Sequence, residues 1–173
     1  WRAALARPVI AWASTREGEE EAILAAMREM PRTPAGIAPL AVLIPRHPQR
    51  FDEVATLVEA AGLAMQRRSR LGAMPVTAPD PHTAVLLGDS LGEMPFYYAA
   101  ADVAIVAGSF APLGGQNLIE ACACGTPVIV GPHTFNFAQA SEDAIEAGAA
   151  LRADDARAAW RLALELIDDQ ARR

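Results

Sequence analysis

Short, continuously apolar runs alternate along the chain with longer segments whose apolar residues recur every three or four positions. The short runs predict buried parallel strands, because a strand covered on both faces is apolar throughout. The longer segments predict amphipathic helices. The predicted strands are residues 8–13, 40–44, 63–66, 84–87, 102–107 and 127–130, and the predicted helices are residues 18–30, 48–61, 94–101, 117–124, 137–147 and 154–173.

The order of these elements predicts an α/β fold with a doubly wound parallel sheet, because repeated strand–helix units place their strands in parallel. Gly62, Gly125 and Gly148 follow predicted helices, where glycine commonly ends a helix. Residues 67–81 are rich in Gly and Pro and predict an irregular connection, whose arginines are expected to form a solvated run. We find neither an internal repeat nor an internal boundary, so residues 1–173 are expected to form a single domain.

The composition fits one folded domain. Hydrophobic residues make up 52% and charged residues 21% of the 173 positions, which excludes disorder, coiled coil and collagen. A formal net charge of -6 offers duplex nucleic acid no basic surface, so nucleic acid is not an expected partner. No apolar run approaches the roughly 20 residues that a membrane-spanning helix needs, and no signal-peptide layout is present. We therefore expect the chain itself to be soluble.

The two cysteines, Cys122 and Cys124, predict neither a disulfide nor a zinc site. A helix would point them in different directions, and no further cysteine completes a ligand set. We expect small core residues in a cytosolic setting, with no metal and no cofactor. The chain begins at Trp1 without an initiator methionine and soon enters a predicted strand, so we expect an excised domain.

Polar residues and glycines follow most of the predicted strands. In a parallel sheet the loops after the strands emerge at the carboxyl edge, where open α/β folds bind ligands. Residues far apart in the sequence are therefore expected to line one crevice, with Arg46, Gly115, Asn117, Glu120 and His133 around it. The loops concerned are residues 14–20, 45–48, 88–93, 108–117 and 131–136.

Two adjacent glycines, Gly114 and Gly115, precede a predicted helix. Backbone without side chains can approach an anion closely, and a helix start presents unpaired N–H groups, so a phosphate fits there. Glycines in this place also make plain turns, and both interpretations stay open. Glu120, one turn into the helix, either accepts hydrogen bonds from a ribose diol in the same crevice or is an ordinary exposed glutamate.

Arg46 and His47 directly follow a buried strand and are expected to stand at the sheet edge. Arg46 offers a rigid fork for a phosphate or a carboxylate. His47, like His133, is either a site residue or a turn histidine bonded to backbone. Asp89 and Glu93 are typical of carboxylates stabilised at the start of a helix.

Five motifs follow one another in these loops. They are ASTREGEE at residues 13–20, PRHPQRF at 45–51, GDSLGEM at 88–94, GGQN at 114–117 with Glu120 after it, and GPHTFNF at 131–137. In order and spacing they resemble the C-terminal half of the 3-deoxy-D-manno-octulosonic acid (Kdo) transferases. The resemblance runs from about residue 8 to residue 152, and GPHTFNF is its most distinctive string.

The resemblance implies the C-terminal half of a GT-B glycosyltransferase, a fold built from two Rossmann-like domains. Enzymes of this family move Kdo from CMP-Kdo to a lipid A precursor, with inversion, in lipopolysaccharide assembly at the cytoplasmic face of the bacterial inner membrane. The C-terminal domain holds the donor, and the N-terminal domain carries the membrane anchor, the acceptor site and the glutamate that acts as general base. The resemblance therefore implies CMP-Kdo as the partner of this chain, and no catalytic residue in it.

The family's motifs also imply roles for single residues. Arg46 would pair with the phosphate or the Kdo carboxylate, the N–H groups of residues 115–117 would receive phosphate charge, and Glu120 or Glu93 would fix the cytidine half. Arg16 and Gln116 stand where the family usually has histidine, and they can donate hydrogen bonds but cannot act as an imidazole. The expected donor-binding residues are Ser14, Arg16, Arg46, His47, Gly92, Glu93, Gly114, Gly115, Gln116, Asn117, Glu120, His133 and Asn136.

Two other functions stay open. A different GT-B enzyme that uses a nucleotide sugar, such as a UDP-sugar transferase or an epimerase, would keep the fold and the glycine-rich helix start. A nucleotide-binding module without catalysis would keep them as well. A comparison of CMP with UDP binding separates the first from a Kdo transferase, and a parent reading frame with an upstream hydrophobic anchor counts against the second.

Overall fold

Seven strands form one all-parallel sheet, in the order β3-β4-β2-β1-β5-β6-β7, in a computed structural model that describes residues 5–72 and 77–169. This arrangement confirms the predicted doubly wound α/β fold. The strands are β1 (Val9–Thr15), β2 (Leu40–Pro45), β3 (Met65–Arg67), β4 (Val85–Leu87), β5 (Val103–Val106), β6 (Val128–Val130) and β7 (Ala150–Arg152). The sequence pattern did not predict β7, because three residues with one half-buried Leu151 at their centre are too short to show a strand pattern.

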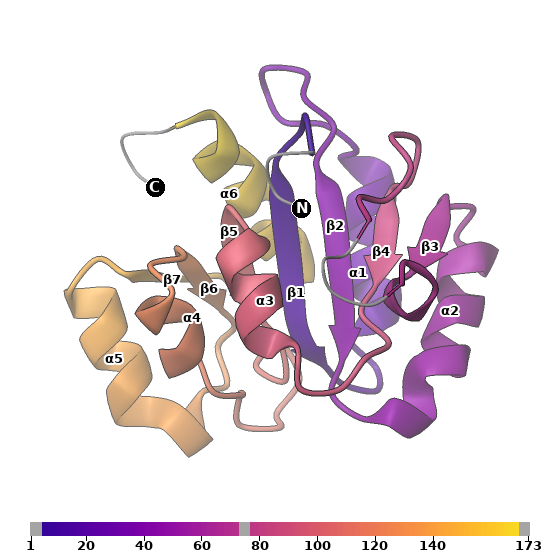
Figure 1. Ribbon diagram of the computed structural model, residues 1–173. Helices are drawn as coiled ribbons and strands as arrows, with labels where there is room; N and C mark the ends of the chain where they lie inside the picture. Colours follow the sequence, from indigo (N-terminus) through magenta and orange to yellow (C-terminus); the bar gives the residue numbers. More distant parts are fainter. Residues whose placement is uncertain (1–4, 73–76, 170–173) are drawn as a thin grey trace.

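Helices cover both faces of the sheet (Figure 1). On one face lie α1 (Glu20–Glu29), α2 (Phe51–Ala60) and α6 (Ala156–Asp168), and on the other lie α3 (Met94–Ala100), α4 (Ile119–Ala123) and α5 (Ala138–Glu146). Single 3₁₀ turns lie in the connections of the described chain, namely η2 (Pro48–Arg50), η3 (Arg68–Arg70) and η4 (Phe135–Phe137). The helix predicted at 117–124 is only five residues long, and residues 170–173 of the predicted closing helix and 73–76 of the predicted irregular connection lie outside the described residues.

The core has two sides because successive strand residues point to opposite faces. In β1, Ile10 and Trp12 pack under α1 and α6, whereas Val9 and Ala11 pack on the other side of the sheet. Trp12 stacks on Trp160 of α6, with ring centroids 6.4 Å apart. The buried rings therefore tie the first strand to the last helix.

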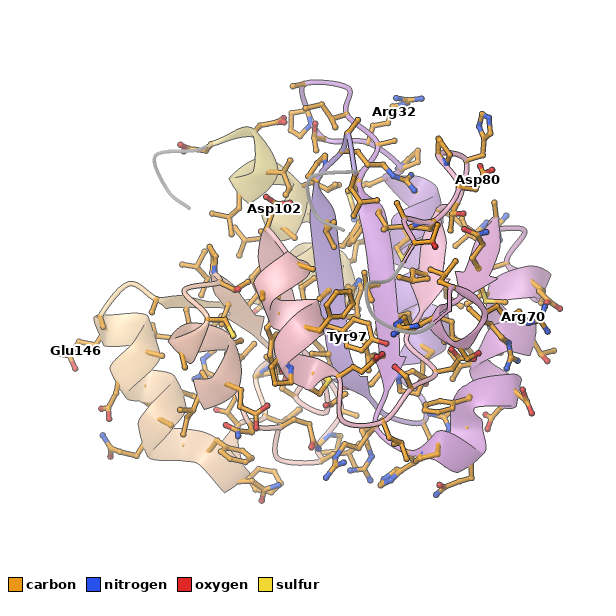
Figure 2. All side chains as sticks on the ribbon, in the orientation of Figure 1. Arg32, Arg70, Asp80, Tyr97, Asp102 and Glu146 are labelled. Atoms are coloured by element: carbon orange, nitrogen blue, oxygen red, sulfur yellow. The ribbon has the colours of Figure 1, made fainter. Side chains whose placement is uncertain are left out.

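The strand order reverses direction at β1, which lies between β2 and β5. In an open α/β sheet this reversal leaves a crevice beyond the carboxyl ends of the strands, where ligands bind. Those ends point downward in Figure 1, and Figure 2 shows Arg32 and Asp102 at the opposite, amino edge. Within the described ranges, no helix is long and apolar enough to cross a membrane.

Candidate functional site

The loop between β5 and α4, residues 108–117 and here called the glycine loop, contacts the ends of both neighbouring strands. Arg46, directly after β2, donates from Nε to the side-chain oxygen of Gln116 over 3.2 Å. Asn136, after β6, donates from its backbone to Gly114 over 3.0 Å and from its side chain to the Leu113 carbonyl over 3.1 Å. Residues predicted from separate motifs thus lie together at the carboxyl edge of the sheet.

Ser109 fixes the glycine loop to the loop after β6. Its side chain is fully buried, and its hydroxyl accepts from the N–H of Gly131 over 2.8 Å. Its carbonyl accepts from the N–H of His133 over 2.9 Å, so the backbone of that predicted site residue is held firmly. A Cβ on Gly131 would lie 2.4 Å from the Ser109 carbonyl oxygen, which explains the need for glycine there.

Gly114 is also required by its surroundings. Its φ is +89°, and a Cβ would lie 2.3 Å from the side-chain nitrogen of Asn136 and 2.5 Å from the ring of Phe135. The two predicted site residues Gly114 and Asn136 are therefore in direct contact. The glycine loop packs directly against the GPHTFNF motif because Gly114 has no side chain to keep them apart.

Arg46 presents an exposed guanidinium at this edge of the sheet. Its backbone N–H donates to the Thr15 carbonyl over 3.0 Å, which anchors the residue to the end of β1, and its side chain is exposed. Only Nε is bound, to Gln116, and the two terminal nitrogens have no partner in the described ranges. A guanidinium held in this way can offer both terminal N–H groups to one anion.

Ser14 and Arg16 lie on either side of Thr15 at the end of β1, to which Arg46 is bonded. Ser14 has a left-handed φ of 60° at an irregularity in the pairing of β1 with β2, so the chain turns sharply as the strand ends. Arg16 is half-buried, and its guanidinium has no partner within residues 5–72 and 77–169. His47 follows Arg46 with a half-buried side chain and precedes the η2 turn.

The backbone N–H groups of the glycine loop differ in their availability. The N–H of Gly115 was predicted to receive phosphate charge. It donates instead to the Gly108 carbonyl over 2.8 Å and is not free for a phosphate. The N–H groups of Gln116 and Asn117 have no partner in the described part of the chain. Since α4 has only five residues, its dipole adds little, and these two N–H groups and Arg46 are the donors for an anion.

Glu120 lies next to these donors. Its exposed carboxylate accepts from the Asn117 side chain over 3.3 Å, and the Asn117 side-chain oxygen accepts from the N–H of Ile119 over 3.0 Å. Asn117 therefore holds Glu120 at the start of α4, where the carboxylate keeps acceptor capacity for a hydroxyl group.

The GDSLGEM loop after β4 is built differently from the other loops. Glu93 accepts from Arg68 over 2.6 Å and from the hydroxyl of Ser90. Asp89 accepts from the backbone and the hydroxyl of Ser69, over 2.8 and 2.7 Å. The described side-chain bonds of Glu93 and Asp89 thus run to η3, to Arg67 at the end of β3 and to their own loop, and none runs to the glycine loop.

The prediction of a solvated arginine run is wrong for Arg68, whose side chain is only 5% exposed because it pairs with Glu93. Tyr97 of α3, labelled in Figure 2, closes this cluster through a 2.7 Å hydrogen bond with Ser90. Burial raises the pKa of Tyr97 to about 12, so the phenol is neutral. Gly92 stands apart at the exposed tip of the loop, with φ +74°.

A buried ion pair links α1, which follows β1, to the η2 turn, which follows β2. Arg50 of η2 donates to Glu20 of α1 over 2.7 Å and to Glu53 over 2.9 Å. Burial raises the pKa of Glu20, whose side chain is 1% exposed, while the hydrogen bond from Arg50 lowers the pKa of Glu53. Sequence reasoning missed this group of three residues, because Glu20 and Glu53 look like ordinary carboxylates at the start of a helix.

Two further residues that position the site were missed. Arg152 of β7 donates to the Gly131 carbonyl over 2.9 Å and to the Thr134 hydroxyl over 3.2 Å, and so supports the GPHTFNF loop from the sheet edge. Glu19 is buried, and its carboxylate contacts the glycine loop.

The cysteines also differ from expectation, since Cys122 is half-buried and Cys124 exposed. In the described ranges no cluster of His, Cys, Asp and Glu could hold a metal ion.

Comparisons with known proteins converge on one family. Residues 79–173 match the family model for glycosyl transferases group 1. The chain is 65% identical over its whole length to the 3-deoxy-D-manno-octulosonic acid transferase of Bordetella pertussis, of which it covers 40%. It is 37% identical over 93% of its length to the protein of the same description from Haemophilus influenzae, of which it covers 36%. The chain thus spans about two fifths of the length of these relatives.

Solved structures show the same similarity. The C-terminal CMP-Kdo binding domain of WaaA from Acinetobacter baumannii superposes with a TM-score of 0.86 at 32% identity, over 98% of this chain and 88% of that one. A molybdenum cofactor carrier protein from Chlamydomonas reinhardtii reaches a TM-score of 0.52 at 14% identity, which is a likeness of fold alone. The first match confirms the predicted Rossmann-like fold, that of the C-terminal half of a GT-B enzyme.

Proposed function

Because the chain belongs to the group 1 glycosyltransferases, and among them to the Kdo transferases, we propose that it is a single donor-binding domain that holds CMP-Kdo. The observation that carries the proposal is the contact between Arg46 and Gln116, which places beside the glycine loop a guanidinium whose two terminal nitrogens have no partner among residues 5–72 and 77–169. An anionic group fits between them. CMP-Kdo carries two such groups, a phosphate and a sugar carboxylate.

The proposed division of roles follows from the contacts. The Arg46 guanidinium and the N–H groups of Gln116 and Asn117 take the phosphate, with Arg16, directly after β1, as a second cation. Glu120, held by Asn117, accepts hydrogen bonds from the ribose. Of the two glutamates expected to fix the cytidine half, Glu120 is the better candidate, since both oxygens of Glu93 have partners within the protein.

The remaining predicted residues support this site indirectly. Gly114 and Asn136 fix the glycine loop, and His133 is tied to it through its backbone. Ser14 directs the loop that carries Arg16, and His47 stands beside Arg46. Gly92 lies on the tip of the GDSLGEM loop, which reaches a donor only if the nucleoside half extends toward β4.

We propose that the whole enzyme transfers Kdo to a lipid A precursor by direct displacement. The acceptor hydroxyl attacks the anomeric carbon as the bond to the CMP phosphate breaks, the hydroxyl proton passes to a general base, and CMP leaves with the bonding electrons. Arg46 and the loop N–H groups stabilise the charge that grows on the departing phosphate. The general base, the acceptor site and the contact with the bacterial inner membrane are assigned to parts of the enzyme beyond these 173 residues.

Calorimetric titration of this chain with CMP, and separately with UDP, tests the proposal. We expect CMP to bind and UDP to bind at least about tenfold more weakly, a difference of roughly 1.4 kcal/mol. Arg46→Ala should lower the affinity for CMP, whereas Arg32→Ala, at the amino edge of the sheet, should leave it unchanged. Tighter binding of UDP would favour a different nucleotide-sugar enzyme, and binding of neither nucleotide would contradict a donor-binding role.

The chain alone should bind without turnover. If the general base and the acceptor site lie elsewhere in the enzyme, incubation with CMP-Kdo and a lipid A precursor releases no CMP above the uncatalysed rate. Transfer of Kdo by this chain alone would contradict the proposed division of roles. A longer parent protein with full activity is the positive control.

A further inference from the structure

Glu19 places a buried carboxylate against the glycine loop. The residue is 3% exposed, and one carboxylate oxygen accepts from the N–H of Gly108 over 2.8 Å and from the N–H of Arg16 over 3.0 Å. The other oxygen accepts from the N–H groups of Phe110 over 3.1 Å and Ala111 over 3.4 Å. Both oxygens are therefore used by backbone groups from two different loops.

This arrangement is not that of an ordinary helix cap. Glu19 stands at the N-cap position of α1, yet its side chain makes no hydrogen bond to the first turn of that helix. The side chain reaches instead to residues 89 to 92 positions further along the chain. Its contribution is to the position of the glycine loop rather than to the start of the helix.

The N–H groups of Gly108, Phe110 and Ala111 all donate to the Glu19 carboxylate, and backbone N–H groups that converge in this way can form an anion site. Here Glu19 fills that site with the protein's own carboxylate, so no ligand anion can take it. The N–H of Gly115 is held by the Gly108 carbonyl over 2.8 Å, and Gly108 is itself held by Glu19. A chain of hydrogen bonds thus links Glu19 through Gly108 to the end of the loop, where Gln116 meets Arg46.

We propose that Glu19 is a positioning residue for donor binding. Its carboxylate fixes the first half of the glycine loop, and the bond between Gly115 and Gly108 carries that order to the second half. The backbone of Gln116 and Asn117 is thereby held beside Arg46 before any ligand arrives. The inference rests on the proposed function, because it assumes that these groups meet the donor phosphate.

Glu19→Gln tests this role with almost no change of size. The new amide NH₂ faces backbone N–H groups that need an acceptor, so at least one pair of loop hydrogen bonds is lost. We expect CMP to bind at least about tenfold more weakly, by calorimetry, to a variant that remains folded. The matched control is Glu21→Gln, which removes the same charge from an exposed site in the first turn of α1 and should bind CMP as the wild type does.

Backbone amide NMR signals supply a readout that is independent of any nucleotide. In Glu19→Gln, the signals of Gly108, Phe110 and Gln116 should shift strongly, while those of α2 and β3 stay in place. Unchanged loop signals would overturn the positioning role. Shifted loop signals with CMP affinity within about twofold of the wild type would overturn it as well, because the loop would then move without consequence for binding.

A second variant covers the case in which Glu19→Gln does not fold. Glu19→Asp keeps the charge, but its carboxylate is one methylene shorter and reaches only one of the two loops. We expect a folded protein that binds CMP at least about threefold more weakly, and binding equal to wild type would overturn the proposal. Absence of CMP binding by the wild-type chain contradicts the proposed function instead, while the amide signals still decide whether Glu19 orders the loop.

Discussion

Replacement of Gly131 by alanine tests whether the two loops at the carboxyl edge are locked together. The added Cβ would lie 2.4 Å from the carbonyl oxygen and 2.6 Å from the carbonyl carbon of Ser109, and both are backbone atoms. The two loops must therefore separate by most of an ångström before the contact is acceptable. Gly131 itself has no left-handed φ, so the effect is steric alone.

The size of the loss follows from these contacts. Overpacking against backbone costs about 1–3 kcal/mol. Separation of the loops also strains the buried 2.8 Å hydrogen bond from the Gly131 N–H to Ser109, worth about 1 kcal/mol. We expect a total of about 3 kcal/mol in the free energy of unfolding, which corresponds to a Tm lower by roughly 6–12 °C in a protein of this size.

Gly125→Ala is the matched control, because it isolates backbone strain from steric contact. Gly125 has φ +72°, but nothing lies within 4 Å of its added Cβ. Its cost should be only the strain of the left-handed region, about 1–2 kcal/mol. Urea and thermal unfolding of both variants, followed by circular dichroism, give the comparison.

The reasoning also predicts a difference in binding. Gly131→Ala displaces the glycine loop and should weaken CMP binding at a temperature where the variant is folded, whereas Gly125→Ala should not. If the free energy of unfolding of Gly131→Ala lies within about 1 kcal/mol of the wild-type value, or falls by less than that of Gly125→Ala, the two loops can separate at little cost and are not locked by backbone contact.

Arg50→Met should destabilise the protein by about 3–5 kcal/mol at neutral pH, because it leaves the buried Glu20 carboxylate without its cation. Because burial raises the pKa of Glu20 in the folded state, this loss should be small below the unfolded pKa and should grow as pH rises through the folded pKa. Equal losses in urea unfolding at pH 4 and pH 7.5 would contradict that cause. Arg46→Ala should cost about 1.5–3 kcal/mol of CMP binding and Arg46→Lys less, because lysine keeps the charge but not the fork; in a full-length enzyme kcat should fall further than affinity, and a lower Tm with unchanged kinetics would make Arg46 structural. Tyr97→Phe should cost about 1 kcal/mol through its lost hydrogen bond to Ser90, with the same loss from pH 6 to 9 because the pKa of Tyr97 is about 12; a loss that varies across this range would be the contrary result.

Local sequence patterns predicted the elements that lie in the centre of the sheet. Buried strands such as β1 and β2 are continuous apolar runs, and the place of Arg46 follows because it comes directly after one of them. The edge strand β7 was not predicted, since its three residues, of which only Ala150 is buried, carry no such run. Strand topology thus explains why residues of separate motifs meet.

The missed contacts share a physical cause. Glu19 bonds to residues about 90 positions away, and Arg68 pairs with Glu93 across two loops, so the partners that fix these side chains in the site lie far beyond one helical turn. In the sequence, such residues look like an N-cap and a solvated charge. The N–H of Gly115 was assigned wrongly for a related reason, because a bend within the loop turns it toward Gly108.

The stack beneath the glycine loop gives this protein an internal optical reporter. Trp12 is fully buried, lies against Trp160, and meets the ring of Phe110 edge-on with centroids 5.8 Å apart. Because Phe110 belongs to the glycine loop, any movement of that loop alters the polarity around the Trp12 indole, on which its emission depends. Intrinsic fluorescence can therefore report, without a label, whether the glycine loop keeps its position when a nucleotide binds.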